Sequence, residues 1–347
     1  MPVYKDEKRK TWYFKTRYKD RYGKAKQKLK RGFKAPREAK LAEAEFLTSI
    51  KDAFTDNVTL DEVFKHNMSV NEYAYNTIRR RNIEFNKHIQ PFFRDIPLKK
   101  IDAQKSIDFK HYLDTNFTSS NSAKMVFTTF KVLINHAKKF FNYKDNPTLY
   151  TPKFKTDSKD YHFIKQNDFD EKVKHMMHKN YRELTILLFY TGLRVGEALA
   201  LQWKNVHLED NNLFVQYTLN ILNDTINEPK TKASRNFVPY PMPILSMLKK
   251  LKKEAEIEYY GFNDDYFVFG GYKPYKYRTY YKQFKKFFPN LRVHDLRHSY
   301  ASHLINKGID IYLVKELMRH TNIQQTANTY GHLYNDRKQS AMSVFED

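Results

Sequence analysis

The stretches TGLRVGEAL (191–199), HDLRHSY (294–300) and RHTNIQQTANTYGHL (319–333) decide how this chain is interpreted. Arginine presents a planar fork of N–H donors that matches phosphate oxygens and stays charged at every relevant pH. A tyrosine hydroxyl needs activation, but it can form a covalent intermediate that is attacked again. Histidines can donate a hydrogen bond or accept the tyrosyl proton. The stretches therefore predict a site that holds and attacks a phosphodiester, made by Arg194, His294, Arg297, His320 and Tyr330.

The order and spacing of these residues carry more weight than any one of them. The chain has 26 tyrosines, so Tyr330 by itself would pass for an ordinary core or surface residue. His294 and Arg297 are three residues apart, which places them on one face of a helix. Arg194 follows a Thr-Gly turn about a hundred residues earlier in the sequence. An ordered set of this kind is far rarer by chance than a single match.

The composition is that of a folded, strongly basic protein. The length of 347 residues predicts two or three domains, and 41% hydrophobic residues suffice for packed cores. The formal charge of +23 attracts nucleic acid or an anionic membrane surface. No apolar run approaches the ~20 residues of a membrane span, and the start MPVYKDEKRK lacks the apolar region of a signal peptide. The absence of cysteine excludes disulfides and thiolate chemistry. These features favour a cytosolic protein that faces DNA.

Residues 1–55 have the pattern of a small basic β-sheet followed by a helix. Aromatic and basic residues interleave in TWYFKTRYKD (11–20) and KAKQKLKRGF (24–33), which predicts two or three strands around a turn. The helix is expected from about Pro36. The alternative is a solvated, disordered basic arm. Because a sheet can enter the DNA major groove, we expect candidate DNA contacts at Trp12, Arg17 and Lys28.

Residues 56–148 are predicted to form a compact domain of four helices. Thr59 and Glu62 form a capping-box pattern, and Asp102 can cap a later helix. The segment 122–141 has an apolar stripe at helical spacing. Three arginines of this domain can face a phosphate backbone or lie on a solvated helix face: Arg79, Arg80 and Arg81.

Residues 149–164 contain no periodic pattern and are predicted to be a linker. The region 165–347 is expected to be mostly helical, with one small sheet formed by strands at 212–219 and 234–240. The expected fold class is therefore a multidomain chain, mainly α with small β-sheets. Helices are predicted near 181–192, 242–258, 276–288, 293–306 and 311–318.

The chain resembles the tyrosine recombinase (phage integrase) family. TGLRVGEALAL matches the family's first arginine box, HDLRHSYASHL its second, and LMRHTNIQQTANTYGHL the segment with the last histidine and the nucleophile. The resemblance is specific over about 185–335 and looser over 59–145, which is similar to the family's helical core-binding domain. Over 1–45 it suggests the arm-type DNA-binding module of mobile-element integrases.

The resemblance implies cleavage and rejoining of DNA through a 3′-phosphotyrosyl link, without metal, cofactor or ATP. It places the nucleophile on Tyr330 and the phosphate-binding groups on Arg194 and Arg297. It implies that His294 assists proton transfer at the tyrosine and that His320 donates to a phosphate oxygen. The basic turn PKTKASR (229–235) matches the hairpin that supplies the lysine that protonates the leaving oxygen. That lysine is Lys230, which matches the Lys-Thr pair, or Lys232.

Two positions qualify the match. Arg319 stands where the family usually has glycine, so it either alters the local turn or adds a phosphate contact. Glu197 falls where the family often has an acidic residue that supports the site, and the alternative is an ordinary carboxylate on a helix surface.

The implied partners are double-stranded attachment sites of core and arm type, bound by a homotetramer in the bacterial cytoplasm. A directionality factor or a host DNA-bending protein can join them. The tail after Tyr330 either packs on a neighbouring protomer or is solvated. Three other functions fit part of the sequence: a type IB topoisomerase, a DNA-binding regulator without catalysis, and a membrane-surface protein. The basic arm argues against the first, the complete residue set against the second and the motif spacing against the third.

Overall fold

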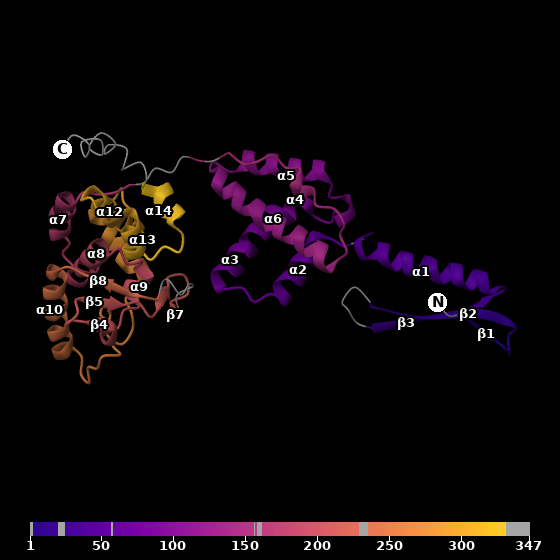
Figure 1. Cartoon of the computed structure of the whole chain (residues 1–347), viewed down its shortest axis with the longest axis horizontal. Helices are drawn as coiled ribbons and strands as arrows, with labels where there is room; N and C mark the ends of the chain where they lie inside the picture. The colour runs from indigo at the N-terminus through magenta and orange to yellow at the C-terminus, as the bar shows by residue number, and fades with distance from the viewer. Residues whose placement is uncertain are drawn as a thin grey trace, which may run out of the picture. The chain divides into compact units, whose positions relative to one another are not determined.

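The computed structural model describes residues 3–19, 25–56, 58–155, 157, 162–228 and 235–330. The chain forms two compact units, Met1–Ser158 and Lys159–Asp347. The first holds a β-sheet with a helix and a bundle of helices, and the second holds further helices around small sheets (Figure 1). The expected fold class, multidomain and mainly α with small β-sheets, is confirmed. No helix in these ranges has the length and apolar character that spanning a membrane requires.

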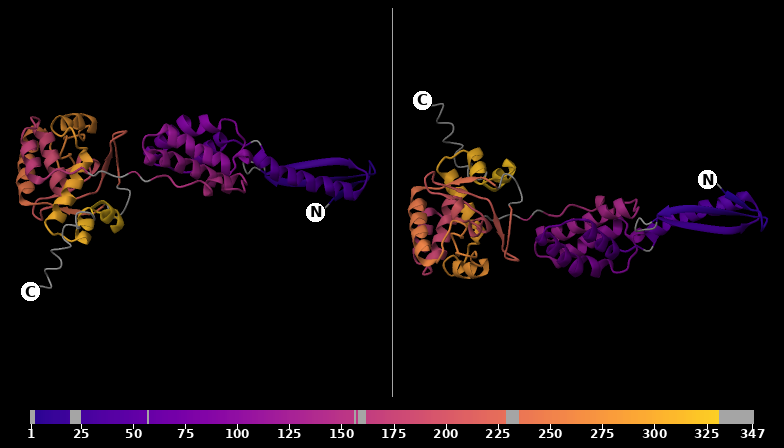
Figure 2. Two further views of the ribbon diagram at one scale, coloured as in Figure 1. Left: turned by 90° about the horizontal axis from the view of Figure 1, so that it is seen from above. Right: turned by 90° about the horizontal axis from the view of Figure 1, so that it is seen from below.

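An antiparallel sheet covered by one helix forms the amino-terminal part of the first unit. Its strands are ordered β1 (Val3–Asp6), β2 (Thr11–Lys19) and β3 (Ala25–Phe33). Helix α1 (Pro36–Asp56) lies along the sheet in both views of Figure 2. The ring of Phe14 on β2 is buried, with its centroid 6.0 Å from that of Phe33 and 6.2 Å from that of Phe46 on α1. Aromatic burial between sheet and helix is what folds this short basic segment.

The rest of the first unit is a helical bundle, as the apolar spacing predicts. Thr59 and Asp102 cap helices through their side chains, which accept hydrogen bonds from the N–H groups of Glu62 and Lys105. The apolar stripe of α6 is buried against the other helices. The elements are α2 (Leu60–Val70), α3 (Tyr75–Glu84), a π-helical turn (Phe85–Ile89), α4 (Gln90–Phe93), α5 (Ala103–Asn116) and α6 (Ser120–Phe140), with 3₁₀ turns at Leu98–Lys100 and Pro147–Leu149.

Part of the expected linker packs on this bundle. The ring of Phe154 lies 5.4 Å from that of Phe127 on α6, and the Asp157 carboxylate accepts hydrogen bonds from Ser119 and Asn121 at the start of the same helix. These contacts fix residues 151–155 and Asp157 to the first unit.

The second unit packs its helices around two small sheets. Its helices are α7 (Gln166–Lys174), α8 (Lys179–Thr191), α9 (Val195–Leu199), α10 (Met242–Glu258), α11 (Tyr277–Phe287), α12 (Val293–Asn306), α13 (Ile311–Leu317) and α14 (Ile323–Tyr330), with a 3₁₀ turn at Trp203–Asn205. Its strands are β4 (Val206–His207), β5 (Asn212–Phe214), β6 (Thr218–Asn220), β7 (Thr225–Asn227) and β8 (Phe237–Pro239).

The expectation of a single strand over 212–219 and one sheet is wrong. The segment divides into β5, which pairs with β4 and β8, and β6, which pairs with β7. The second pair places β6 against α9, where a Cβ on Gly196 would lie only 2.6 Å from the Leu219 carbonyl oxygen. β6 thus packs closely on α9 and pairs with β7 instead of continuing the sheet of β5.

Candidate active site

A tight turn between two helices positions Arg194. Helix α8 ends at Gly192, which has a φ of 61° and whose N–H donates to the Leu188 carbonyl. A Cβ at Gly192 would lie 2.5 Å from the Tyr300 ring, so glycine is needed for space as well as for conformation. Arg194 then precedes α9, and its side chain keeps 37% of its surface exposed. The turn thus presents a cation that a ligand can reach.

The Glu197 carboxylate, buried in α9, holds Arg194 in place. Its Oε1 accepts from Arg194 Nη1 at 2.9 Å, and its Oε2 accepts from the Arg194 backbone N–H at 3.0 Å. Burial opposes ionisation of Glu197, but the charges of Arg319, Arg194 and Arg297 outweigh it and lower its pKa. Glu197 is therefore a buried carboxylate that holds Arg194 and not a helix-surface residue.

Helix α12 turns Arg297 into the interior. The Asp295 carboxylate caps the start of the helix by accepting from the Arg292 backbone N–H at 2.7 Å. Arg297, in the second turn of the same helix, is 2% exposed. It donates to the carbonyls of Gly192, at 2.5 Å, and of Met318. This single guanidinium ties the Arg194 turn to the segment that carries His320.

The turn after α13 keeps the backbone that glycine would adopt. Arg319 has a φ of 53°, a left-handed conformation that costs a non-glycine residue roughly 1–2 kcal/mol. Its side chain is 1% exposed and pairs with Glu197 Oε2 at 2.5 Å. Arg319 thus leaves the turn conformation unchanged, and its guanidinium faces the interior carboxylate.

The hydroxyl of Tyr330 lies against His298, a histidine to which the motifs assign no role. Tyr330 ends α14 and is 2% exposed, and its Oη is 2.6 Å from His298 Nδ1. The His298 ring packs edge-on against His294, with centroids 4.9 Å apart. His320 Nδ1 lies 2.8 Å from Thr326 Oγ1 on the tyrosine's own helix. The helix spacing of His294 and His298 was a signal for this pair, because residues four apart share a face.

Burial and the nearby arginines both disfavour further positive charge in the site. Desolvation, followed by the charges of Arg297 and Arg194, lowers the pKa of His320 to about 3. Desolvation and His298 lower the pKa of His294 to about 4, although more than a third of its surface is exposed. Burial, with repulsion from Arg194 and Arg319, lowers the pKa of Arg297 to about 9. These histidines are neutral at pH 7, and the site is arranged to receive an anion.

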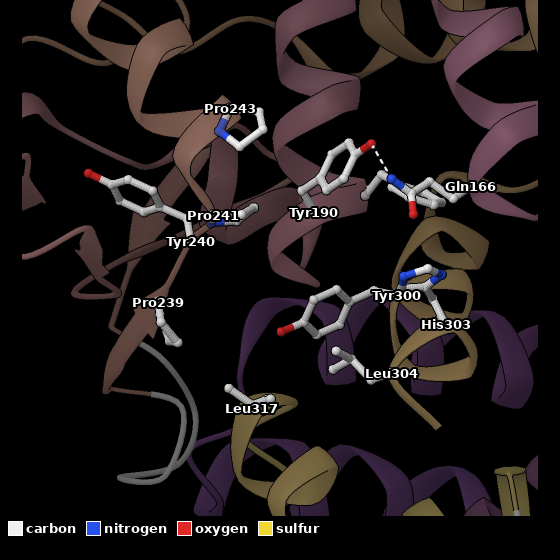
Figure 3. A pocket seen from close by; sticks show the side chains of 11 residues that line it. Gln166, Tyr190, Pro239, Tyr240, Pro241, Pro243, Tyr300, His303, Leu304 and Leu317 are labelled. Carbon is white, nitrogen blue, oxygen red and sulfur yellow. Dashed lines mark hydrogen bonds between the residues drawn. The ribbon is translucent and has the colours of Figure 1, made fainter. Parts of the chain in front are cut away.

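The structure brings Arg194, Glu197, His294, Arg297, His320 and Tyr330 into one cluster, and it adds His298 and Arg319. Lys230 and Lys232 lie outside the described residues. Beside the cluster, Tyr300 also lines an apolar pocket of about 510 Å³ with Tyr190, Leu304 and Leu317 (Figure 3). The Tyr190 hydroxyl accepts from Gln166 Nε2 at 3.1 Å at its edge.

The basic residues of the bundle are in different surroundings. Arg79 is exposed, while Arg80 is partly exposed and lies 3.6 Å from the Glu84 carboxylate. Arg81 stacks on the Tyr73 ring at 4.0 Å and donates to Asn67 Oδ1 at 3.3 Å. Arg81 is thus engaged within the fold, and Arg79 faces solvent.

The two faces of the arm sheet also differ. Lys28 Nζ lies 5.6 Å above the Phe46 ring of α1, so its side chain is on the helix-covered face. Arg17 pairs with Gln27, the neighbour of Lys28, and side chains alternate along a strand, so Arg17 is on the open face. Trp12 is half-buried and pairs with Phe33.

The chain is similar to integrases and tyrosine recombinases along most of its length. The model described as phage integrase family matches residues 162–337, that of an arm DNA-binding domain matches 2–50, and that of a phage integrase N-terminal SAM-like domain matches 59–113. A XerC-like tyrosine recombinase of Caldanaerobacter subterraneus subsp. tengcongensis is 27% identical over 90% of this chain and 90% of its own. The ICEBs1 integrase of Bacillus subtilis is 27% identical over 76% of this chain and 75% of its own.

Solved structures share the fold. The Tn1549 transposon integrase in complex with transposon right end DNA has a TM-score of 0.69 at 17% identity, covering 84% of this chain and all of that one. A lambda integrase tetramer bound to a Holliday junction has a TM-score of 0.60 at 19% identity, covering 94% of this chain and 97% of that one. Because the phage integrase model spans about half of the chain, the chain belongs to the phage integrase family and is a tyrosine recombinase, an enzyme of site-specific DNA recombination.

Proposed function

We propose that this recombinase integrates and excises a mobile element by way of a 3′-phosphotyrosyl link on Tyr330. The observation that carries the proposal is the convergence of Arg194, Arg297 and Tyr330 from distant parts of the chain onto one site. Two arginines can neutralise the non-bridging oxygens of a phosphate, which stabilises the charge that develops at phosphorus. A nucleophilic hydroxyl beside them is placed for attack.

In the proposed reaction, side chains of this chain supply the nucleophile, the proton for the leaving oxygen and the groups that hold the phosphate. Tyr330 Oη bonds to phosphorus as the bond from phosphorus to the 5′-oxygen breaks, and the tyrosyl proton leaves. The departing 5′-oxygen takes a proton from Lys230, or Lys232, in the hairpin. Arg194 and Arg297 hold the phosphate, and His320 donates to one of its oxygens. Rejoining reverses these steps, so the bond energy stays in the covalent intermediate, and the reaction calls for no metal, cofactor or ATP.

We place the proton acceptor at His298, because its Nδ1 lies 2.6 Å from the Tyr330 hydroxyl. Desolvation is the main cause that lowers the pKa of His298, and it favours the neutral ring, which is the form that accepts a proton. His294, which the family resemblance puts in this role, packs on His298 and becomes a second member of the same proton path.

The proposed domains are an arm module at 1–55, a core-binding domain at 56–148, a linker at 149–164 and a catalytic domain at 165–347. The matches to arm and SAM-like models support the first two. We propose that the partners are core and arm sites in double-stranded DNA, and that the active assembly is a homotetramer in the bacterial cytoplasm. The lambda integrase tetramer on a Holliday junction supports the latter. We also propose that a directionality factor or a host DNA-bending protein joins this assembly.

A nicked suicide substrate that carries the element's attachment site tests the proposal. Wild type should form an SDS-resistant protein–DNA adduct, and Tyr330→Phe should form none. An adduct with Tyr330→Phe would overturn the nucleophile assignment. No adduct with wild type would favour a regulator without catalysis, and relaxation of supercoiled DNA without strand exchange would favour a topoisomerase.

A further inference from the structure

Arg319 occupies a backbone position that suits glycine. Its φ is 53°, and its N–H donates to the Glu316 carbonyl at 2.8 Å as α13 ends. Glycine would make the same turn without strain. Strain of this kind persists only where surrounding structure enforces it, and it is concentrated at functional sites.

The guanidinium of Arg319 fixes the orientation of the Glu197 carboxylate by an ion pair. Arg319 Nη2 bonds to Oε2, together with the Arg194 backbone N–H. The other oxygen, Oε1, is left for the Arg194 guanidinium at 2.9 Å. Of the three arginines that lower the pKa of Glu197, Arg319 has the largest effect. The carboxylate is thus anchored on one side and grips Arg194 on the other.

The residues on either side of Arg319 contact Arg297 and the helix that ends at Tyr330. The residue before Arg319, Met318, accepts a hydrogen bond from Arg297 through its carbonyl. The residue after it, His320, contacts Thr326 on α14, whose last residue is Tyr330. Movement of the Arg319 side chain would therefore disturb both the phosphate-binding arginines and the helix of the nucleophile.

We propose that Arg319 is a positioning residue for DNA cleavage, which acts by fixing Glu197 so that Arg194 is held in place for the scissile phosphate. The inference rests on the proposed function. The Arg319 guanidinium pairs with the Glu197 carboxylate, so we assign it to holding that carboxylate and not to contacting the phosphate.

Stability alone is a poor reason for arginine at this position. In the described part of the chain, its Nε and Nη1 are buried without a hydrogen-bond partner, which costs free energy. A buried ion pair is also expensive to desolvate, and apolar replacements are often as stable. The arginine thus carries a backbone cost and a burial cost that glycine would avoid.

The test compares Arg319→Gly with wild type on the nicked substrate at saturating protein. The rate of adduct formation should fall about 10- to 100-fold, by analogy with the loss of a residue that orients the ligands of a metal ion, while affinity for DNA stays within about twofold. Arg319→Lys keeps the charge without the fork and should be intermediate. Arg94→Gly is the matched control, since Arg94 also has a positive φ, of 43°, but lies in the helical bundle.

Two readouts separate positioning from a purely structural role. Millimolar guanidinium chloride should restore part of the rate in Arg319→Gly, and sodium chloride at equal ionic strength should not. In a Glu197→Gln background, Arg319→Gly should slow cleavage by less than about threefold, since both residues act through one contact.

Failure of the positioning role and failure of the proposed function give different results. Without any adduct from wild type, the proposed function itself fails. If wild type forms the adduct and Arg319→Gly matches its rate, the positioning role is wrong. The role is equally rejected if the slow variant ignores guanidinium and its effect multiplies with that of Glu197→Gln.

Discussion

Arginine side chains are used differently in the two units of this chain. In the second unit, Arg297 and Arg319 are almost fully buried and are bonded to carbonyls and a carboxylate. In the first unit, Arg17 and Arg79 are exposed. A buried, fixed cation contributes to the transition state because it needs no reorganisation, whereas an exposed one contributes to affinity by releasing counterions. We therefore expect the buried set to govern the cleavage rate and the exposed set to govern binding and its salt dependence.

Among the arginines, the largest effect should come from Arg297→Ala. Losing a fixed donor to developing charge costs about 10²- to 10³-fold in rate, and the carbonyls of Gly192 and Met318 lose their partner as well. Adduct formation should fall by about 10³-fold, and the melting temperature should also fall. Arg297→Lys is the charge-preserving control. A rate within tenfold of wild type would remove Arg297 from the phosphate site.

The proton path should give the next effect. His298→Asn should slow adduct formation by about 10²-fold, the lower range for general base catalysis. The loss should shrink as pH rises, because the tyrosine then ionises without help. His294→Asn is the comparison, with a smaller expected effect. If His294→Asn is the more damaging substitution at every pH, the proton acceptor is His294.

The arm sheet offers a comparison within the exposed set. Arg17→Ala, on the open face, should weaken arm-site binding about three- to tenfold and reduce the salt slope by about 1, as expected for one phosphate contact. Lys28→Ala should change neither, although the sequence pattern made Lys28 a candidate DNA contact, because its side chain is on the helix-covered face. Binding titrations at several salt concentrations decide this, and equal effects would mean that the open face is not the DNA surface. Neither change should alter the rate of cleavage at saturation.

The smallest effect concerns pH. The pKa of His320 is 6.5 in the unfolded chain, its ordinary value, and is lowered to about 3 in the folded chain. The contribution of this group to stability is therefore complete above pH 6.5 and is lost as the pH falls from there towards 3. Wild type should lose more melting temperature between pH 7.5 and pH 5 than His320→Asn. An equal loss in the two proteins would contradict the lowered pKa.

Motif and spacing predicted the helices and singled out most of the residues that the structure gathers around Tyr330, because helix caps, apolar stripes and the arginine boxes are local patterns. The paired Arg319 and Glu197 are 122 residues apart, so their contact arises only from tertiary packing. The contact of His298 with Tyr330 likewise depends on how α14 packs against α12. The division of 212–219 into two strands, with β6 packed closely on α9, is a tertiary feature that the local pattern did not predict.

The most direct measurement is to locate the DNA in the trapped adduct. The adduct formed on a nicked substrate is digested with protease and nuclease, and mass spectrometry identifies the modified peptide. Among the 26 tyrosines of the chain, we predict that the nucleotide is attached to Tyr330 through its 3′-phosphate. Attachment to any other residue, or through a 5′-phosphate, would contradict the proposed active site.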